Sequence, residues 1–144
     1  MNSTTAQDVQ FSPYQPSDDE EYMSDKQLAH FRQILLNWKT QLLEEAERTK
    51  TYIHDESNAL PDINDRATQE EEFALALRTR DRERRLVHKI EKSLSEIDSG
   101  DYGFCETCGV EIGLRRLEAR PTATQCIDCK SLSEIKERQA LGHA

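Results

Sequence analysis

Apolar side chains recur every three or four residues along two long stretches of the chain. The apolar positions of the first stretch, residues 24–56, are Leu28, Phe31, Leu35, Trp38 and Leu42. Those of the second stretch, residues 66–98, are Phe73, Ala76, Val87, Ile90, Leu94 and Ile97. Alternating spacings of three and four place these side chains on one face of a helix, which is the seam of a coiled coil. The pattern therefore predicts two long helices that share a seam.

Glycine and proline are almost absent from this part of the chain. All five glycines lie at or beyond Gly100, and the only proline between Tyr22 and Gly100 is Pro61. A single helix-breaking residue near the middle predicts one short turn between two helices. A short turn forces these helices to lie antiparallel. We expect a mainly α fold, in which a long antiparallel two-helix coiled-coil hairpin carries a small four-cysteine zinc-finger globular module with a C-terminal helix.

The chain then divides into three segments. Residues 1–23 are acidic and are expected to be largely irregular, residues 24–99 form the hairpin with its tip at 57–66, and residues 100–144 form the module. Within the module, residues 131–141 are expected to form a short helix that packs on the zinc finger. The sequence does not decide whether Phe11, Tyr14 and Tyr22 pack on the module. Antiparallel pairing gathers the large apolar side chains at the base of the hairpin. It sets Leu28, Phe31, Leu35 and Trp38 against Ile97, Leu94, Ile90 and Val87, respectively. Towards the tip the seam becomes polar, at Glu45, Thr49, Arg80 and Glu83. A hairpin of this kind either carries its tip to a partner or serves only for dimerisation.

Composition narrows the range of functions. Only 35% of the 144 residues are hydrophobic, and 28 acidic against 19 basic side chains give a net charge of −9. The longest apolar run has five residues, far below the roughly 20 that span a membrane, and the first residues do not resemble a secretory signal. Affinity for DNA comes mostly from cations on phosphates, so this charge disfavours an autonomous DNA binder. We expect a cytoplasmic, monomeric protein with a protein partner.

The four cysteines form two CxxC pairs separated by 17 residues, Cys105 with Cys108 and Cys126 with Cys129. This spacing is typical of a site in which four thiolates bind one Zn²⁺. Four thiolates leave no open coordination position, so the zinc is expected to be structural. A thioredoxin-like redox motif would need a βαβ context, and structural disulfides are disfavoured in a reducing cytoplasm.

Two acids follow the only proline of the hairpin. Asp62 and Asp65 stand three residues apart where the second helix should begin. Aspartate is a good helix N-cap and suits the positive end of the helix dipole. Alternatively, the hairpin carries these charges about 50 Å from its base, the length of 33 helical residues, to meet a partner. Spacing alone leaves both interpretations open.

Three motifs in this order resemble the DksA/TraR zinc-finger family of RNA polymerase-binding regulators of the bacterial stringent response. They are the D-x-x-D-x-A of Asp62, Asp65 and Ala67, the stretch RDRERRL, and YGFCETCGVEIGLRRLEARPTATQCIDCK. The resemblance covers roughly residues 20–141. It implies that the hairpin enters the secondary channel of RNA polymerase without contacting DNA. With guanosine tetraphosphate (ppGpp), such factors repress ribosomal RNA promoters and activate amino-acid biosynthesis promoters.

The resemblance also assigns roles to individual residues. Asp62, Asp65 and Ala67 correspond to the tip that lies near the polymerase active site, and Arg82 corresponds to a contact with the channel rim. The positions that bind ppGpp at the shared interface correspond to Leu86, Lys89, Arg120 and Lys130.

Three alternative functions are weighed against the sequence: a DNA-binding regulator, an enzyme and a redox sensor. The four-cysteine module with its neighbouring arginines is compatible with a DNA-binding zinc-finger regulator, although no basic recognition helix is evident. An enzyme is disfavoured because the sequence lacks a Walker loop, a G-x-S-x-G and an H-E-x-x-H motif. Oxidation of the thiolates would release zinc, so redox sensing is a secondary possibility.

Overall fold

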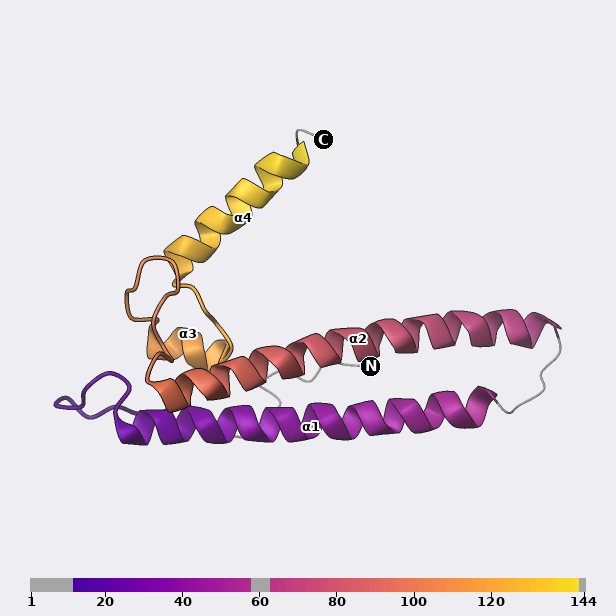
Figure 1. The fold of residues 1–144 in the computed structure, drawn as a ribbon, viewed down its shortest axis with the longest axis horizontal. Helices are drawn as coiled ribbons and strands as arrows, with labels where there is room; N and C mark the ends of the chain where they lie inside the picture. The colour runs from indigo at the N-terminus through magenta and orange to yellow at the C-terminus, as the bar shows by residue number, and fades with distance from the viewer. Residues whose placement is uncertain (1–11, 58–62, 143–144) are drawn as a thin grey trace.

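The computed structural model describes residues 12–57 and 63–142. Its helices are α1 (Asp25–Ser57), α2 (Ile63–Ser99), α3 (Leu114–Ala119) and α4 (Ile127–Gly142). Helices α1 and α2 run side by side, and α3 with its connecting loops lies at one end of the pair, from which α4 projects (Figure 1). In the described ranges the only β-type pairing is an isolated bridge between Phe104 and Glu111. The predicted fold, a helical hairpin with a small terminal module, is confirmed.

The first helix begins where the sequence predicts it. The Ser24 Oγ accepts a hydrogen bond from the Gln27 N–H at 3.3 Å, and the Gln27 Oε1 accepts one from the Met23 N–H at 2.7 Å. The first bond satisfies an amide that the first helical turn leaves without a partner, and the second ties this turn to the residue before its N-cap. At the other end the helices extend further than predicted. Helix α1 includes Ser57 and α2 begins at Ile63, whereas the sequence predicts helical stretches of residues 24–56 and 66–98.

The seam has the predicted antiparallel register. Ion pairs join Arg32 to Asp98 and Lys39 to Glu91 along its edge, the second with an Nζ–Oε1 distance of 3.5 Å. Near the tip the rings of Tyr52 and Phe73 meet edge to face, with centroids 6.5 Å apart. The buried hydrophobic residues of the core are Phe31, Ile34, Leu35, Trp38, Leu42, Ile90, Ile97, Tyr102, Cys105, Ile112 and Leu117. Burying each large apolar side chain contributes about 1.5–3 kcal/mol.

The buried strip of α1 is wider than the two-position seam. Ile34 is 3% exposed and Gln27 is 1% exposed, although neither falls in the predicted series. They stand seven residues apart, so they form a third row beside the seam. This row is buried because the base of the hairpin packs against more than the second helix.

The tip-side half of the seam is polar, as predicted, and parts of it are buried. Thr49 is 6% exposed and Glu83 is 7% exposed. Within the described residues, neither the Glu83 Oε2 nor the Gln41 Oε1 has a hydrogen-bond partner. Burial, and then the nearby Glu45 carboxylate, raise the pKa of Glu83. This half of the hairpin therefore contributes less to stability than the base.

A buried tyrosine fixes the terminal module to the base of the hairpin. Helix α2 ends at Ser99, and the next residue, Gly100, has a φ of 84°, which suits glycine. The Tyr102 N–H then bonds the Glu96 carbonyl at 3.2 Å. The Tyr102 hydroxyl donates to the Pro121 carbonyl at 2.7 Å, and its ring lies 5.7 Å from that of Phe31. The module and the hairpin thus share one core.

The described part of the N-terminal segment is irregular and packs on the base. The Tyr22 hydroxyl bonds the Gly103 carbonyl at 2.7 Å and also contacts the Ile112 carbonyl. The Tyr14 N–H donates to the Glu118 Oε1 at 2.9 Å. The sequence left the position of these tyrosines undecided, and the structure shows both on the module. Phe11, the third aromatic residue of the segment, lies outside the described residues.

The last helix differs from the prediction. The sequence favoured a short capping helix from Ser131 to Leu141 packed on the module, whereas α4 spans 16 residues, begins at Ile127 and has no buried residue. It projects from the module (Figure 1), and Leu132 and Ile135 are 57% and 47% exposed. The predicted start was too late because the end of the second CxxC already belongs to the first turn of this helix. Across the described chain no helix is both long enough and apolar enough to cross a membrane.

Candidate metal centre and anion pocket

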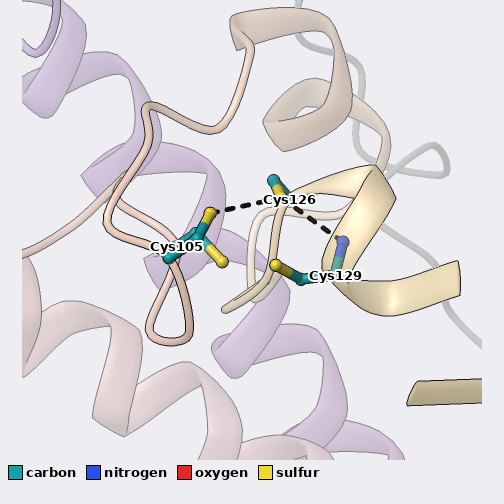
Figure 2. A group of neighbouring side chains, drawn as sticks. Cys105, Cys126 and Cys129 are labelled. Atoms are coloured by element: carbon teal, nitrogen blue, oxygen red, sulfur yellow. Dashed lines mark hydrogen bonds between the residues drawn. The ribbon is translucent and has the colours of Figure 1, made fainter. Parts of the chain in front are cut away.

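Two turns bring the four cysteines together. Cys105 and Cys108 lie on the loop after α2, Cys126 precedes α4, and Cys129 lies in the first turn of α4. The four sulfur atoms all lie within 4.8 Å of one another. Figure 2 shows the side chains of Cys105, Cys126 and Cys129 converging on one point.

The spacing of the sulfurs fits a tetrahedral zinc ion. Zinc–thiolate bonds of about 2.3 Å place the corners of a tetrahedron roughly 3.8 Å apart. The Sγ atoms of Cys108 and Cys126 are 3.7 Å apart. The donor set and its size therefore suit one Zn²⁺, which would be held by all four thiolates and would leave no position for a substrate.

The backbone of the first CxxC turn is arranged for metal binding. The Cys105 N–H bonds the Val110 carbonyl at 2.8 Å, and the Gly109 N–H bonds the Cys105 carbonyl at 2.9 Å. Gly109 has a φ of 79°, which lets the chain turn tightly around the sulfurs. Backbone N–H groups, that of Cys108 first, lower the pKa of the Cys105 thiol to about 6. By contrast, hydrogen bonding to Cys126 raises the pKa of Cys129 to about 12.

A cationic pocket lies between α2 and the module. Its volume is about 260 Å³, and its lining residues are Lys89, Lys92, Arg116, Arg120, Thr122, Ala123, Thr124, Gln125 and Lys130. Five of these nine side chains are cationic and come from α2, α3, α4 and the loop between the last two. Guanidinium forks and ammonium groups are suited to phosphate oxygens. The pocket can therefore hold a ligand with several phosphates.

The pocket unites three of the four residues that the sequence assigned to ppGpp. Lys89, Arg120 and Lys130 all line it, whereas Leu86 is half-buried and packs against the hydrophobic core. Sequence reasoning missed Lys92 and Arg116 as lining residues. Their spacing from the assigned residues could have indicated them. Lys92 follows Lys89 by three residues and Arg116 precedes Arg120 by four, and residues at these spacings lie on the same face of a helix.

The predicted contact residues of the hairpin lie away from this pocket. Asp65 belongs to the first turn of α2, Ala67 is exposed in the next turn, and Asp62 lies outside the described residues. Arg82 is exposed further along α2. It lines a groove of about 680 Å³ between the two long helices, together with Arg48 of α1.

Comparison with known proteins identifies the family. A family model described as the N-terminal domain of the DnaK suppressor protein DksA matches residues 27–97, and the prokaryotic dksA/traR C4-type zinc finger matches residues 100–134. The chain is 60% identical over 130 residues to the RNA polymerase-binding transcription factor DksA of Escherichia coli strain K12, and the match covers 90% of this chain and 86% of that protein. The chain belongs to the DksA family.

Further DksA proteins agree with this assignment. DksA of Haemophilus influenzae is 58% identical over 130 residues, which cover 90% of each protein. The solved structure of transcription factor DksA2 from Pseudomonas aeruginosa has a TM-score of 0.78 and 38% identity, and the match covers 86% of this chain and 94% of that one.

The family zinc finger is of the C4 type, so the four clustered cysteines form its zinc site and Zn²⁺ is the cofactor. DksA proteins are named as transcription factors and are not enzymes.

Proposed function

We propose that this chain is a transcription factor that binds RNA polymerase directly, enters the secondary channel with its hairpin and, together with ppGpp, modulates initiation. The observation that carries the proposal is 60% identity to a DksA named as RNA polymerase-binding, over 90% of this chain. In this function the protein represses ribosomal RNA promoters and activates amino-acid biosynthesis promoters. It acts in the cytoplasm as a monomer.

The shape of the molecule supports entry into a channel. Helices α1 and α2 have 33 and 37 residues, so each is roughly 50 Å long or slightly more. Two paired helices are about 20 Å wide. Such a rod reaches a buried catalytic centre that a globular domain cannot reach. Asp65 and Ala67 lie at the end of the rod that is far from the zinc module, and Asp62 directly precedes α2 in the sequence.

The cationic pocket supports ppGpp as the second ligand. Lys89, Arg120 and Lys130 line the same cavity, and two pyrophosphate groups supply enough negative charge to engage all three. The pocket opens at the base of the hairpin, beside the surface that would remain at the mouth of the channel. Arg82 is exposed on α2 and is proposed to contact the channel rim.

Transcription in vitro from a ribosomal promoter tests the tip. The variant Asp62→Asn/Asp65→Asn removes two charges but keeps side chains that cap helices well. We expect it to lose inhibition with and without ppGpp. The matched control, Glu44→Gln/Glu47→Gln, removes the same charge from exposed positions of α1 and should inhibit like the wild-type protein. Unchanged inhibition by the aspartate variant would assign these acids to helix capping alone.

The ppGpp site is tested in the same assay with Lys89→Glu. We expect this variant to lose the additional inhibition that ppGpp causes, because its carboxylate repels phosphate. Zinc content and helical content are measured for every variant, so that loss of folding is recognised. An undiminished ppGpp effect would contradict the assignment of the pocket. Binding of the protein to promoter DNA without polymerase would instead favour a DNA-binding zinc-finger regulator.

A further inference from the structure

Lys92 lines the cationic pocket and faces carboxylates from two elements. Its Nζ lies 4.0 Å from the Oε1 of Glu96, one turn along α2, and 3.8 Å from the Oε2 of Glu106 on the first CxxC turn. Both separations are too long for a hydrogen bond. Lys92 is 59% exposed and Glu106 is 53% exposed, so water weakens these contacts. The ammonium group is therefore held loosely and is free to move to a stronger anion.

Hydrogen bonds hold the backbone of Glu106 and also reach its carboxylate. Its N–H donates to the Thr124 carbonyl at 2.8 Å, and the Thr124 Oγ1 donates to the Glu106 Oε1 at 3.4 Å. One residue further along, the Gln125 Nε2 donates to the Thr107 Oγ1 at 3.0 Å. Thr124 and Gln125 both line the pocket. The metal-binding turn thus holds a carboxylate at the pocket rim, where its two oxygens contact two of the lining residues.

We propose that Lys92 is a further cation for the phosphate ligand, in addition to Lys89, Arg120 and Lys130, and that Glu106 is its counter-ion before the ligand binds. This proposal rests on the proposed ppGpp site and adds a specificity device to it. A phosphate group that enters the pocket takes Lys92 away from the Glu106 carboxylate. Only a ligand with high negative charge compensates for that loss and for the repulsion by Glu106. The pair therefore selects for ligands with several phosphates over those with few.

The chain offers matched variants for a test. Glu106→Gln removes the counter-ion, and Lys92→Met removes the cation while keeping most of the length of the side chain. Glu91→Gln is the control. Glu91 lies on α2 and is exposed, as Glu106 is, but it pairs with Lys39, which does not line the pocket. Dissociation constants for ppGpp and for guanosine diphosphate are measured on the complex of the full chain with RNA polymerase. Zinc content is checked for each variant, since Glu106 adjoins Cys105.

Each variant has an expected result. Glu106→Gln should bind ppGpp about three- to tenfold more tightly, as expected for removing one exposed charge close to a polyanion, and should bind guanosine diphosphate with a smaller gain. Lys92→Met should weaken ppGpp binding by a similar factor, and Glu91→Gln should stay within about twofold of the wild-type protein. Equal gains for both ligands, or a Glu91→Gln effect as large as that of Glu106→Gln, would overturn the proposal.

The double variant tests whether Lys92 moves. If Lys92 leaves Glu106 for the ligand, the gain from Glu106→Gln shrinks at least about twofold in the Lys92→Met background. If Lys92 stays in place, the two effects multiply independently, and the proposed exchange is wrong. Lys89→Glu is measured alongside. Loss of ppGpp binding in Lys89→Glu without any effect at Lys92 and Glu106 refutes only this inference, whereas normal binding by Lys89→Glu refutes the proposed site itself.

Discussion

Glu83 gives the sharpest prediction about stability. Its side chain belongs to the seam between α1 and α2, is 7% exposed and has one oxygen without a hydrogen-bond partner in the described structure. Glu83 also lines a pocket of about 150 Å³, in which Leu42 and Val87 are apolar neighbours and Arg80 and Arg84 are charged ones. Replacing Glu83 by leucine should therefore remove a buried polar atom and place an apolar side chain against apolar neighbours.

The expected magnitude follows from the cost of the unsatisfied oxygen. A buried polar atom without a partner costs about 1–3 kcal/mol. We expect Glu83→Leu to raise the free energy of unfolding at pH 7 by about 1–2 kcal/mol, which corresponds to a rise in Tm of roughly 2–8 °C for a chain of this size. The control Glu47→Leu, at an exposed position of α1, should change the free energy by less than about 0.5 kcal/mol.

The effect should depend on pH. Burial and the nearby Glu45 raise the pKa of Glu83 above its ordinary value of 4.5, while Arg82 and Arg48 oppose this shift. A carboxyl group whose pKa is higher in the folded state destabilises the fold above that pKa, and this penalty disappears as the pH falls towards 4.5. The stability gap between Glu83→Leu and the wild-type protein should therefore narrow as the pH is lowered from 7.

Urea unfolding followed by circular dichroism at 222 nm, repeated at several pH values, measures both effects. Glu96, whose pKa burial also raises, is present in both proteins, so its contribution cancels from the comparison. A less stable Glu83→Leu variant, or a stability gap that stays constant between pH 7 and pH 4, would refute this interpretation of the polar seam.

Two further predictions concern the terminal module. Tyr102→Phe removes the hydroxyl that donates to the Pro121 carbonyl at 2.7 Å, so it should destabilise the module by about 1–3 kcal/mol in urea unfolding; no change would show that water replaces the hydroxyl. Cys126→Ser should abolish stoichiometric zinc binding and unfold residues 100–142, as measured by zinc analysis and hydrogen exchange, while α1 and α2 remain helical. A folded, protected module without zinc would contradict the structural role of the metal.

The sequence predicts the hairpin well because its signals are local. Ser24 and Gly100 mark the ends of the helical pair by side-chain and backbone chemistry that acts within a few residues. The spacing of three and four also predicts the register, which Tyr52 and Phe73 extend towards the tip. Such features depend on neighbours in the same helix or directly opposite in the seam.

Features that depend on packing between distant segments were not predictable in the same way. Tyr22 contacts carbonyl groups more than 80 residues away, and nothing near it in the sequence indicates that partner. Ile34 is buried because the base of the hairpin packs against more than α2. Lys92 and Arg116 enter the cationic pocket only when α2, α3 and the last loop are assembled.

In the proposed function, the far end of the hairpin lies deep within RNA polymerase. The most direct measurement places the photo-crosslinker p-benzoylphenylalanine at Ala67, which is exposed in α2, and identifies the polymerase residues that become attached. We predict crosslinks to residues around the catalytic Mg²⁺, because the rod of about 50 Å carries this position from the channel mouth to the active centre. Crosslinks confined to the outer surface of polymerase would contradict entry of the hairpin into the channel.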